Sequence, residues 1–216
     1  MKKIILIGDS IRMGYDKYVK EALSDVASVY YPDDNCRFAQ YTLRYLHDWK
    51  KKFGWPDDTD LVHWNAGLWD VAEIYGEKPL SSCEHYSDMI KRIDGRIRLL
   101  FPRAKVVFAT STAIREEGYT GVFKRHNAII EKFNEEAIAA LESTGTGTVI
   151  NDLYAHTVNV PEECCSDPTH YNTPMGAAYM GNKVLSVICP LLDISAADVK
   201  VDGFKLENYS TDNIGY

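Results

Sequence analysis

Short apolar runs separated by longer amphipathic stretches recur along this chain of 216 residues. The first run, at 3–8, is continuous and rich in isoleucine, as expected of a strand that is buried on both faces. Four further runs with strand character follow at 29–32, 60–65, 105–110 and 147–150. Elsewhere apolar positions recur at intervals of three and four residues, which predicts helices at 17–27, 38–53, 83–100, 122–141 and 174–189.

The alternation of strands and helices predicts the fold class. It indicates an α/β protein with a five-stranded parallel sheet between two layers of helices, a three-layer α/β/α arrangement. In such sheets, ligands bind beyond the carboxyl ends of the strands, where the strand order reverses. No linker or internal repeat divides the pattern. We therefore expect a single domain over 1–216, with 194–216 forming a less regular C-terminal extension.

Composition and charge exclude several classes of partner. With 45% hydrophobic and 25% charged residues, the chain has the balance of an ordinary globular protein. A formal net charge of −7 opposes binding to nucleic acid or to an anionic membrane surface. The first apolar run reaches polar residues too soon for a signal peptide, so we expect a cytoplasmic protein, although an export signal removed beforehand would leave no trace.

The cysteines indicate neither a disulfide framework nor a metal centre. There are five of them, an odd number at irregular spacing, so reduced thiols are expected. Cys164 and Cys165 are neighbours, but adjacent ligands suit a tetrahedral zinc site poorly and no Cys-x-x-Cys pair accompanies them. We expect no bound metal.

Ser10 is the first candidate for chemistry. It closes the tripeptide Gly8-Asp9-Ser10 at the carboxyl end of the first predicted strand, where a parallel sheet presents reactive groups. The same tripeptide is also a common turn composition, because glycine permits unusual backbone angles and Asp and Ser bond to their own backbone. A nucleophilic role therefore needs a base from elsewhere in the chain.

Asp167 and His170 supply that base. They lie three residues apart in a predicted turn before the last helix. A short carboxylate in such a turn can hold the Nδ1 of the histidine while Nε2 points outward to a serine. The alternative, a loop histidine held by an aspartate for structural reasons only, does not explain why the pair falls at the active edge of the sheet.

Three stretches of the chain resemble the conserved blocks of the SGNH/GDSL hydrolases. Ile5 to Ser10 resembles the first block, Asn65 to Asp70 the third, and Asp167 to His170, with the following Gly176, the last. They occur in the order of that family and span nearly the whole chain. The resemblance implies a flavodoxin-like three-layer fold, ester hydrolysis without a cofactor, and a catalytic triad of Ser10, Asp167 and His170.

The resemblance departs from the family at the groups that stabilise an oxyanion. Members usually carry Gly-x-Asn-Asp in the third block, and Trp69 stands here where the asparagine belongs. Losing one such donor costs about 10²–10³ in rate. The indole N–H of Trp69 can donate, and Asn65 is a possible substitute.

The glycine of the second block has no clear counterpart. Backbone N–H groups of Cys36 or Arg37 lie at the corresponding place, with Asn35 as a side-chain donor, but these residues could equally cap the following helix. The candidates for the oxyanion hole are therefore Ser10, Cys36, Arg37, Asn65 and Trp69.

Several neighbours of these residues are candidates for substrate binding. An arginine suits a carboxylate and aromatic faces suit a sugar ring, which favours a carbohydrate ester over a lipid or small acyl ester. Each such residue is more often packing or surface charge. The substrate-binding candidates are Asp9, Arg12, Asn35, Trp64 and Tyr171.

The sequence thus predicts a serine esterase that removes an acyl group, most simply acetyl, from a small-molecule or carbohydrate ester. An alternative is a non-catalytic carbohydrate-binding protein that keeps the fold, a possibility raised by Trp69. A flavodoxin-like nucleotide or flavin binder is disfavoured, because the first turn lacks a glycine-rich phosphate cradle. The oligomeric state cannot be deduced from the sequence.

Overall fold

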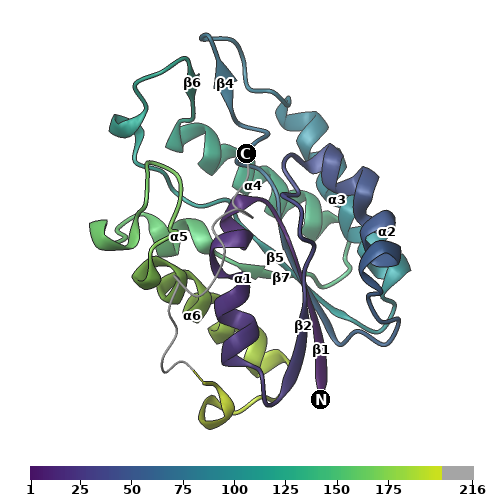
Figure 1. The fold of residues 1–216 in the computed structure, drawn as a ribbon. Helices are drawn as coiled ribbons and strands as arrows, with labels where there is room; N and C mark the ends of the chain where they lie inside the picture. Colours follow the sequence, from purple (N-terminus) through teal and green to yellow (C-terminus); the bar gives the residue numbers. More distant parts are fainter. Residues whose placement is uncertain (201–216) are drawn as a thin grey trace.

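A five-stranded parallel sheet forms the centre of the protein, as the computed structural model of the chain shows for residues 1–200 (Figure 1). Its order is β2-β1-β3-β5-β7, and every neighbouring pair is parallel. The strands are β1 (Lys2–Ile7), β2 (Ala27–Tyr30), β3 (Leu61–Asn65), β5 (Lys105–Ala109) and β7 (Val149–Asn151). The predicted three-layer α/β/α fold with a five-stranded parallel sheet is therefore confirmed.

Helices cover both faces of this sheet. α1 and α6 pack on one another, whereas α2, α3 and α4 lie side by side in the other layer (Figure 1). The long helices are α1 (Ser10–Ala22), α2 (Ala39–Phe53), α3 (Cys83–Leu100), α4 (Asn127–Ser143) and α6 (Pro174–Leu191), and a short α5 (Leu153–Thr157) follows β7.

The strand order places a switch point next to β1. β2 lies on one side of β1, and β3, β5 and β7 lie on the other, so the order reverses between β1 and β3. The loops that follow these two strands diverge there and leave a crevice in which α/β proteins bind ligands. Ser10 follows β1, and the segment with Trp69 follows β3.

Two predicted helices begin at other residues in the structure. α1 begins at Ser10 and not at Lys17, because the carboxylate of Asp9 caps its first turn by accepting the N–H of Ile11. α4 begins at Asn127 and not at Val122, because the preceding residues are held in a strand. Helical periodicity does not reveal either constraint.

The strand that displaces the start of α4 belongs to a small antiparallel pair outside the main sheet. It joins β4 (Glu73–Ile74) to β6 (Phe123–Lys124), which the sequence analysis did not predict. Strands of two residues are too short for an alternating pattern to identify. Just before β6 lies a 3₁₀ helix, Glu116–Gly118.

The main sheet is buried as its sequence indicates. Ile4, Ile5, Leu6 and Ile7 of β1 have no exposed surface.

No helix among residues 1–200 is long and apolar enough to cross a membrane, and no cluster of three or more His, Cys, Asp or Glu in that range could hold a metal ion. All five cysteines are free thiols. Of the predicted extension, 201–216 lies outside the described residues.

Candidate active site

A rigid turn at the end of β1 holds Ser10 at the first position of α1. Asp9 Oδ1 accepts the backbone N–H of Ile11 at 3.0 Å and the Nδ2 of Asn65 at 2.9 Å. Asn65 also packs directly on Gly8, where an added Cβ would lie 1.8 Å from Asn65 Oδ1. The turn thus requires glycine at position 8, and it fixes Ser10 relative to both β1 and β3.

The turn before α6 orients His170. Asp167 Oδ1 accepts the backbone N–H groups of Thr169, at 2.7 Å, and His170, at 2.8 Å, which closes the loop around the carboxylate. Its other oxygen, Oδ2, lies 2.7 Å from His170 Nδ1. The histidine ring is therefore held by a carboxylate that is itself held by the backbone of the same turn.

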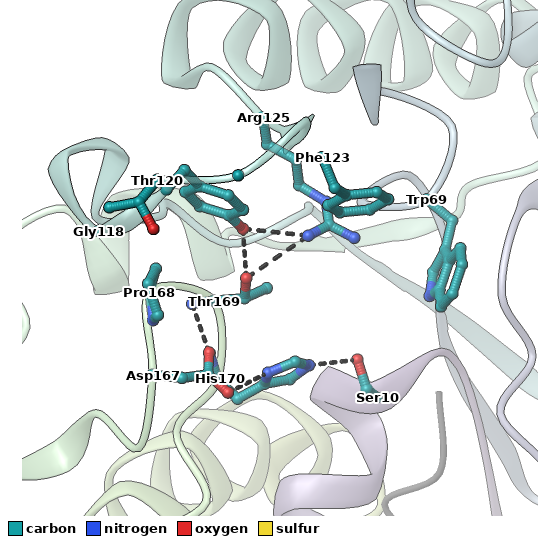
Figure 2. A pocket seen from close by; sticks show the side chains of 12 residues that line it. Ser10, Trp69, Gly118, Thr120, Phe123, Arg125, Asp167, Pro168, Thr169 and His170 are labelled. Carbon is teal, nitrogen blue, oxygen red and sulfur yellow. Dashed lines mark hydrogen bonds and ion pairs between the residues drawn. The ribbon is translucent and has the colours of Figure 1, made fainter. Parts of the chain in front are cut away.

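The two turns meet in a continuous chain of hydrogen bonds. His170 Nε2 lies 2.8 Å from Ser10 Oγ, so Ser10, His170 and Asp167 are connected in series (Figure 2). With Nδ1–H donating to the carboxylate, Nε2 is left to accept the hydroxyl proton of Ser10. The structure thus brings together the three residues that the sequence named as a triad.

The electrostatics of this chain favour an ionised aspartate. Burial by itself raises the pKa of Asp167, but the hydrogen bond and charge of His170 and the two backbone N–H groups outweigh it and lower the pKa to about 2. Asp167 therefore carries a negative charge at neutral pH, where it can stabilise a protonated His170.

A pocket of about 390 Å³ opens in front of Ser10 and His170 (Figure 2). Residues 118–125, which lead from the 3₁₀ helix toward α4, form one wall, and Trp69 adjoins this wall at Phe123. The Trp69 and Phe123 rings meet edge to face, with their centroids 6.5 Å apart. The residues that line the pocket are Ser10, Trp69, Gly118, Tyr119, Thr120, Gly121, Phe123, Arg125, Asp167, Pro168, Thr169 and His170.

Three of the expected oxyanion donors are engaged elsewhere. The N–H of Cys36 donates to the carbonyl of Gly8 at 3.2 Å, and the N–H of Arg37 donates to Asn35 Oδ1 at 2.9 Å. Asn65 donates to Asp9, as described above. As donors to an oxyanion, Cys36, Arg37 and Asn65 are thus corrected by the structure.

Two expected donors remain at the pocket. The N–H of Ser10 is in the first turn of α1, where helices have no internal acceptor for their amides. Trp69 lines the pocket, and Figure 2 shows the nitrogen-bearing edge of its indole on the side of Ser10. These two groups are the candidates for binding negative charge next to the serine.

The five expected substrate-binding residues do not line this pocket. Asp9 and Trp64 have no exposed surface, and the Trp64 ring packs on Phe108 at a centroid distance of 4.8 Å. Asn35 is buried and accepts the N–H of Arg37, two residues on, which holds the loop before α2; it does not cap that helix, whose N-cap residue is Phe38. These three are therefore corrected to structural roles.

Arg12 and Tyr171 are likewise corrected. Arg12 is 1% exposed and pairs with Asp16 at 2.5 Å, while its other N–H groups donate to backbone carbonyls. Tyr171 donates its hydroxyl to the carbonyl of Ala113 at 2.7 Å. Both side chains fix the scaffold behind the site.

Most of the pocket wall has no signature in the sequence. Tyr119, Phe123 and Arg125 carry no motif spacing, and the strand β6 that holds their segment against β4 is only two residues long. Thr169 lies inside the block Asp167 to His170, but nothing in that block indicates that it faces Tyr119 and Arg125. Tyr119 and Thr169 join through their hydroxyl groups, and the Arg125 Nη1 donates to Tyr119 at 3.0 Å. Two adjacent charged residues, Lys124 and Arg125, at the end of the mostly uncharged stretch 119–125 were the one signal available.

Solved structures share this fold, whereas no protein-family model and no curated protein matches the chain. A GDSL-like lipase from Bacteroides thetaiotaomicron is similar with a TM-score of 0.65 and 15% identity, over 87% of each chain. An acetyl xylan esterase has a TM-score of 0.65 and 16% identity, over 86% of this chain and 99% of its own. A carbohydrate esterase family 3 protein from Talaromyces cellulolyticus has a TM-score of 0.62 and 16% identity, over 90% and 100%.

The chain therefore has the fold of the GDSL-like hydrolases, as the resemblance of its sequence blocks implied.

Proposed function

We propose that this chain is an SGNH/GDSL hydrolase that cleaves an acyl ester through Ser10. The observation that carries the proposal is the unbroken series of hydrogen bonds from Ser10 Oγ through His170 to Asp167, at 2.8 and 2.7 Å. A serine hydroxyl is a weak nucleophile until a neighbouring base takes its proton, and this series supplies the base together with the group that orients it.

In the first half of the reaction, Ser10 Oγ bonds to the acyl carbon as its proton moves to His170 Nε2. Asp167 stabilises the resulting imidazolium. Collapse of the tetrahedral intermediate breaks the bond to the alcohol oxygen, which takes the proton from His170 and leaves an acyl group on Ser10.

In the second half, water gives a proton to His170 and bonds to the acyl carbon. The Ser10 ester bond then breaks, the proton returns to Oγ, and the acid is released. No redox or metal chemistry enters these steps.

The oxyanion of each tetrahedral intermediate is stabilised by the Ser10 N–H and the Trp69 indole N–H. The amide at the start of α1 also carries the positive end of the helix dipole, which favours negative charge at this place. Trp69 thereby takes the part that an asparagine side chain has in the family pattern.

An acetyl ester on a carbohydrate is the substrate class that we propose. Three aromatic side chains, Trp69, Tyr119 and Phe123, line the pocket and offer faces on which a sugar ring can pack. Two of the structures with the same fold are described as an acetyl xylan esterase and a carbohydrate esterase. A pocket of about 390 Å³ suits one sugar unit with its ester.

Release of acetate from phenyl acetate and from acetylated methyl glycosides tests this function. The wild type is expected to turn over both kinds of ester, and Ser10→Ala to reduce kcat by about 10⁶. Ser24→Ala, an exposed serine after the far end of α1, is the matched control and should keep wild-type rates. Equal turnover by Ser10→Ala would remove Ser10 from the mechanism.

A non-catalytic carbohydrate-binding protein is the second candidate. It is favoured by one observation, that the Cys36 and Arg37 amides are occupied and the third donor is an indole. A fluorophosphonate probe separates the two functions, because an activated Ser10 forms a covalent adduct and an inert one does not. Adduct formation that disappears in Ser10→Ala supports the esterase.

A further inference from the structure

Arg125 is a buried cation at the pocket whose guanidinium forms no ion pair with any carboxylate of residues 1–200. It is 7% exposed. The buried Arg12 provides a contrast, since it pairs with Asp16 at 2.5 Å. Charged side chains this deeply buried are normally paired, because removing an ion from water is costly.

Hydrogen bonds fix the guanidinium of Arg125 on two of its three nitrogens. Nε donates to the carbonyl of Leu68, and Nη1 donates to the hydroxyl of Tyr119 at 3.0 Å. The guanidinium carbon also lies 4.7 Å from the centre of the Phe123 ring. The side chain is therefore held rigidly in one orientation.

The third nitrogen, Nη2, donates to no atom of residues 1–200. Figure 2 shows it directed to the side of the pocket that Trp69 forms. Asp167 is the one carboxylate among the residues that line the pocket, and its oxygens already accept from His170 and Thr169. Nη2 thus presents two N–H donors and a positive charge to a ligand that enters the pocket.

The position of Arg125 relates it to one part of the substrate. Because His170 must protonate the departing alcohol, the alcohol lies on the His170 side of the acyl carbon. Thr169 immediately precedes His170, and its Oγ1 lies 3.5 Å from Arg125 Nη1. Through Nη1 the guanidinium therefore adjoins the alcohol side of the pocket, and its Nη2 extends from there toward Trp69 (Figure 2).

We propose that Arg125 determines specificity by binding a carboxylate on the alcohol part of the ester. The inference rests on the proposed function and narrows it to esters of acidic alcohols, such as acetylated acidic sugars. A carboxylate oxygen accepts from Nη2 and forms the direct ion pair that Arg125 does not make within residues 1–200, in a pocket where a charge-assisted hydrogen bond is stronger than in open water.

A pair of esters that differ by one carboxylate tests the proposal. We would compare kcat/KM for 3-acetoxybenzoate with that for phenyl acetate, in the wild type and in Arg125→Gln, Arg125→Lys and Arg103→Gln. The ratio of the two values should fall by about tenfold or more in Arg125→Gln. Arg125→Lys keeps the charge and should keep part of the preference.

Arg103→Gln makes the same change of net charge at an exposed residue just before the amino end of β5, whereas Ser10 follows the carboxyl end of β1. This variant should leave the ratio unchanged. A fold defect in an Arg125 variant lowers both values of kcat/KM together and so leaves their ratio intact. An unchanged ratio in Arg125→Gln overturns the proposal.

A binding measurement tests, without catalysis, whether Arg125 binds a carboxylate. 3-Hydroxybenzoate carries no ester, so its dissociation constant for the wild-type protein can be compared by NMR titration with that of neutral 3-hydroxybenzyl alcohol. Tighter binding of the carboxylate that is lost in Arg125→Gln and kept in Arg103→Gln supports the proposal. Equal binding overturns it. Selective binding in a protein that cleaves neither ester would remove the proposed function and leave an anion site.

Discussion

Asn65 Nδ2 donates to Asp9 Oδ1 at 2.9 Å, which ties the end of β3 to the end of β1 directly behind the serine. Asn65 does not line the pocket and is only 3% exposed. Asp9 is fully buried, and its burial raises the pKa of the carboxyl. Asn65 therefore holds the turn that carries Ser10, and in the proposed mechanism the oxyanion depends on other groups.

Asn65→Leu tests this assignment, because leucine has a similar size but no donor. We expect the free energy of unfolding to fall by about 1–3 kcal/mol, since Asp9 loses a partner inside the protein. The value of kcat should fall by about 10-fold to 100-fold as Ser10 is displaced. Urea unfolding and acetate release measure the two effects. A loss of kcat with no loss of stability would instead identify Asn65 as an oxyanion donor.

Trp69→Phe separates the indole N–H from the aromatic face of the same side chain. We expect kcat for phenyl acetate to fall by about 10²-fold while KM changes little, because the ring remains and the donor is lost. Trp69→Asn, which restores the residue of the family pattern, should recover part of the loss.

Trp64→Phe is the matched control for this experiment, since Trp64 is buried and does not line the pocket. It should lower stability and leave kcat close to that of the wild type. Unchanged kcat in Trp69→Phe would show that the indole N–H takes no part.

The pH dependence of stability reports on Asp167. Its pKa is lowered to about 2 in the folded protein, so ionisation favours folding. This contribution is fully present above about pH 4 and is lost as the pH falls through about 2. The side chain is 35% exposed, and solvent screening reduces the contribution to about 1 kcal/mol.

The gap in unfolding free energy between the wild type and Asp167→Asn should therefore narrow by about 1 kcal/mol between pH 5 and pH 2, as measured by urea unfolding at each pH. Asp88→Asn, at an exposed aspartate of α3, serves as the control. In kinetics, Asp167→Asn should lower kcat by about 10⁴, because His170 is no longer held in the required tautomer. A gap that stays constant with pH would contradict the assigned role of the carboxylate.

The buried pair of Arg12 and Asp16 should be structural and not part of substrate binding. Asp16→Ala leaves the Arg12 guanidinium without its partner at 1% exposure, and we expect a loss of about 3–5 kcal/mol in unfolding free energy. Asp48→Ala removes the partner of Arg44 in an exposed pair with the same spacing, and should cost less than about 1 kcal/mol. Similar losses of unfolding free energy in Asp16→Ala and Asp48→Ala would contradict the structural role of the buried pair.

The sequence was sufficient to predict the sheet and the three residues that meet at its edge. Strands such as β1 are continuous apolar runs whose burial depends on few other features. Ser10, Asp167 and His170 lie in turns whose conformation is set within a few residues, by the Asp9 cap and by the Asp167 carboxylate. Turns that are fixed by hydrogen bonds between residues close in sequence can be predicted from the sequence.

The pocket wall could not be predicted in the same way. Arg125 meets Leu68 only because β6 pairs with β4 some 50 residues away, and neither strand is long enough to show a period. Arg12 was misassigned for a related reason. Its partners at Pro32 and Asp34 reach it through the tertiary fold, so proximity to Ser10 in the sequence did not indicate proximity to the pocket.

The antiparallel pair of β4 with β6 also bears on how selectivity could be redesigned. The hydrogen bonds that connect Ser10, His170 and Asp167 are anchored in the turns after β1 and before α6, whereas half of the residues that line the pocket come from 118–125. Grafting or randomising residues 118–125 would thus change the surface that lines the pocket while Ser10, His170 and Asp167 stay in place. Thr169, which hydrogen-bonds to Tyr119 and Arg125, is the main contact between the two parts.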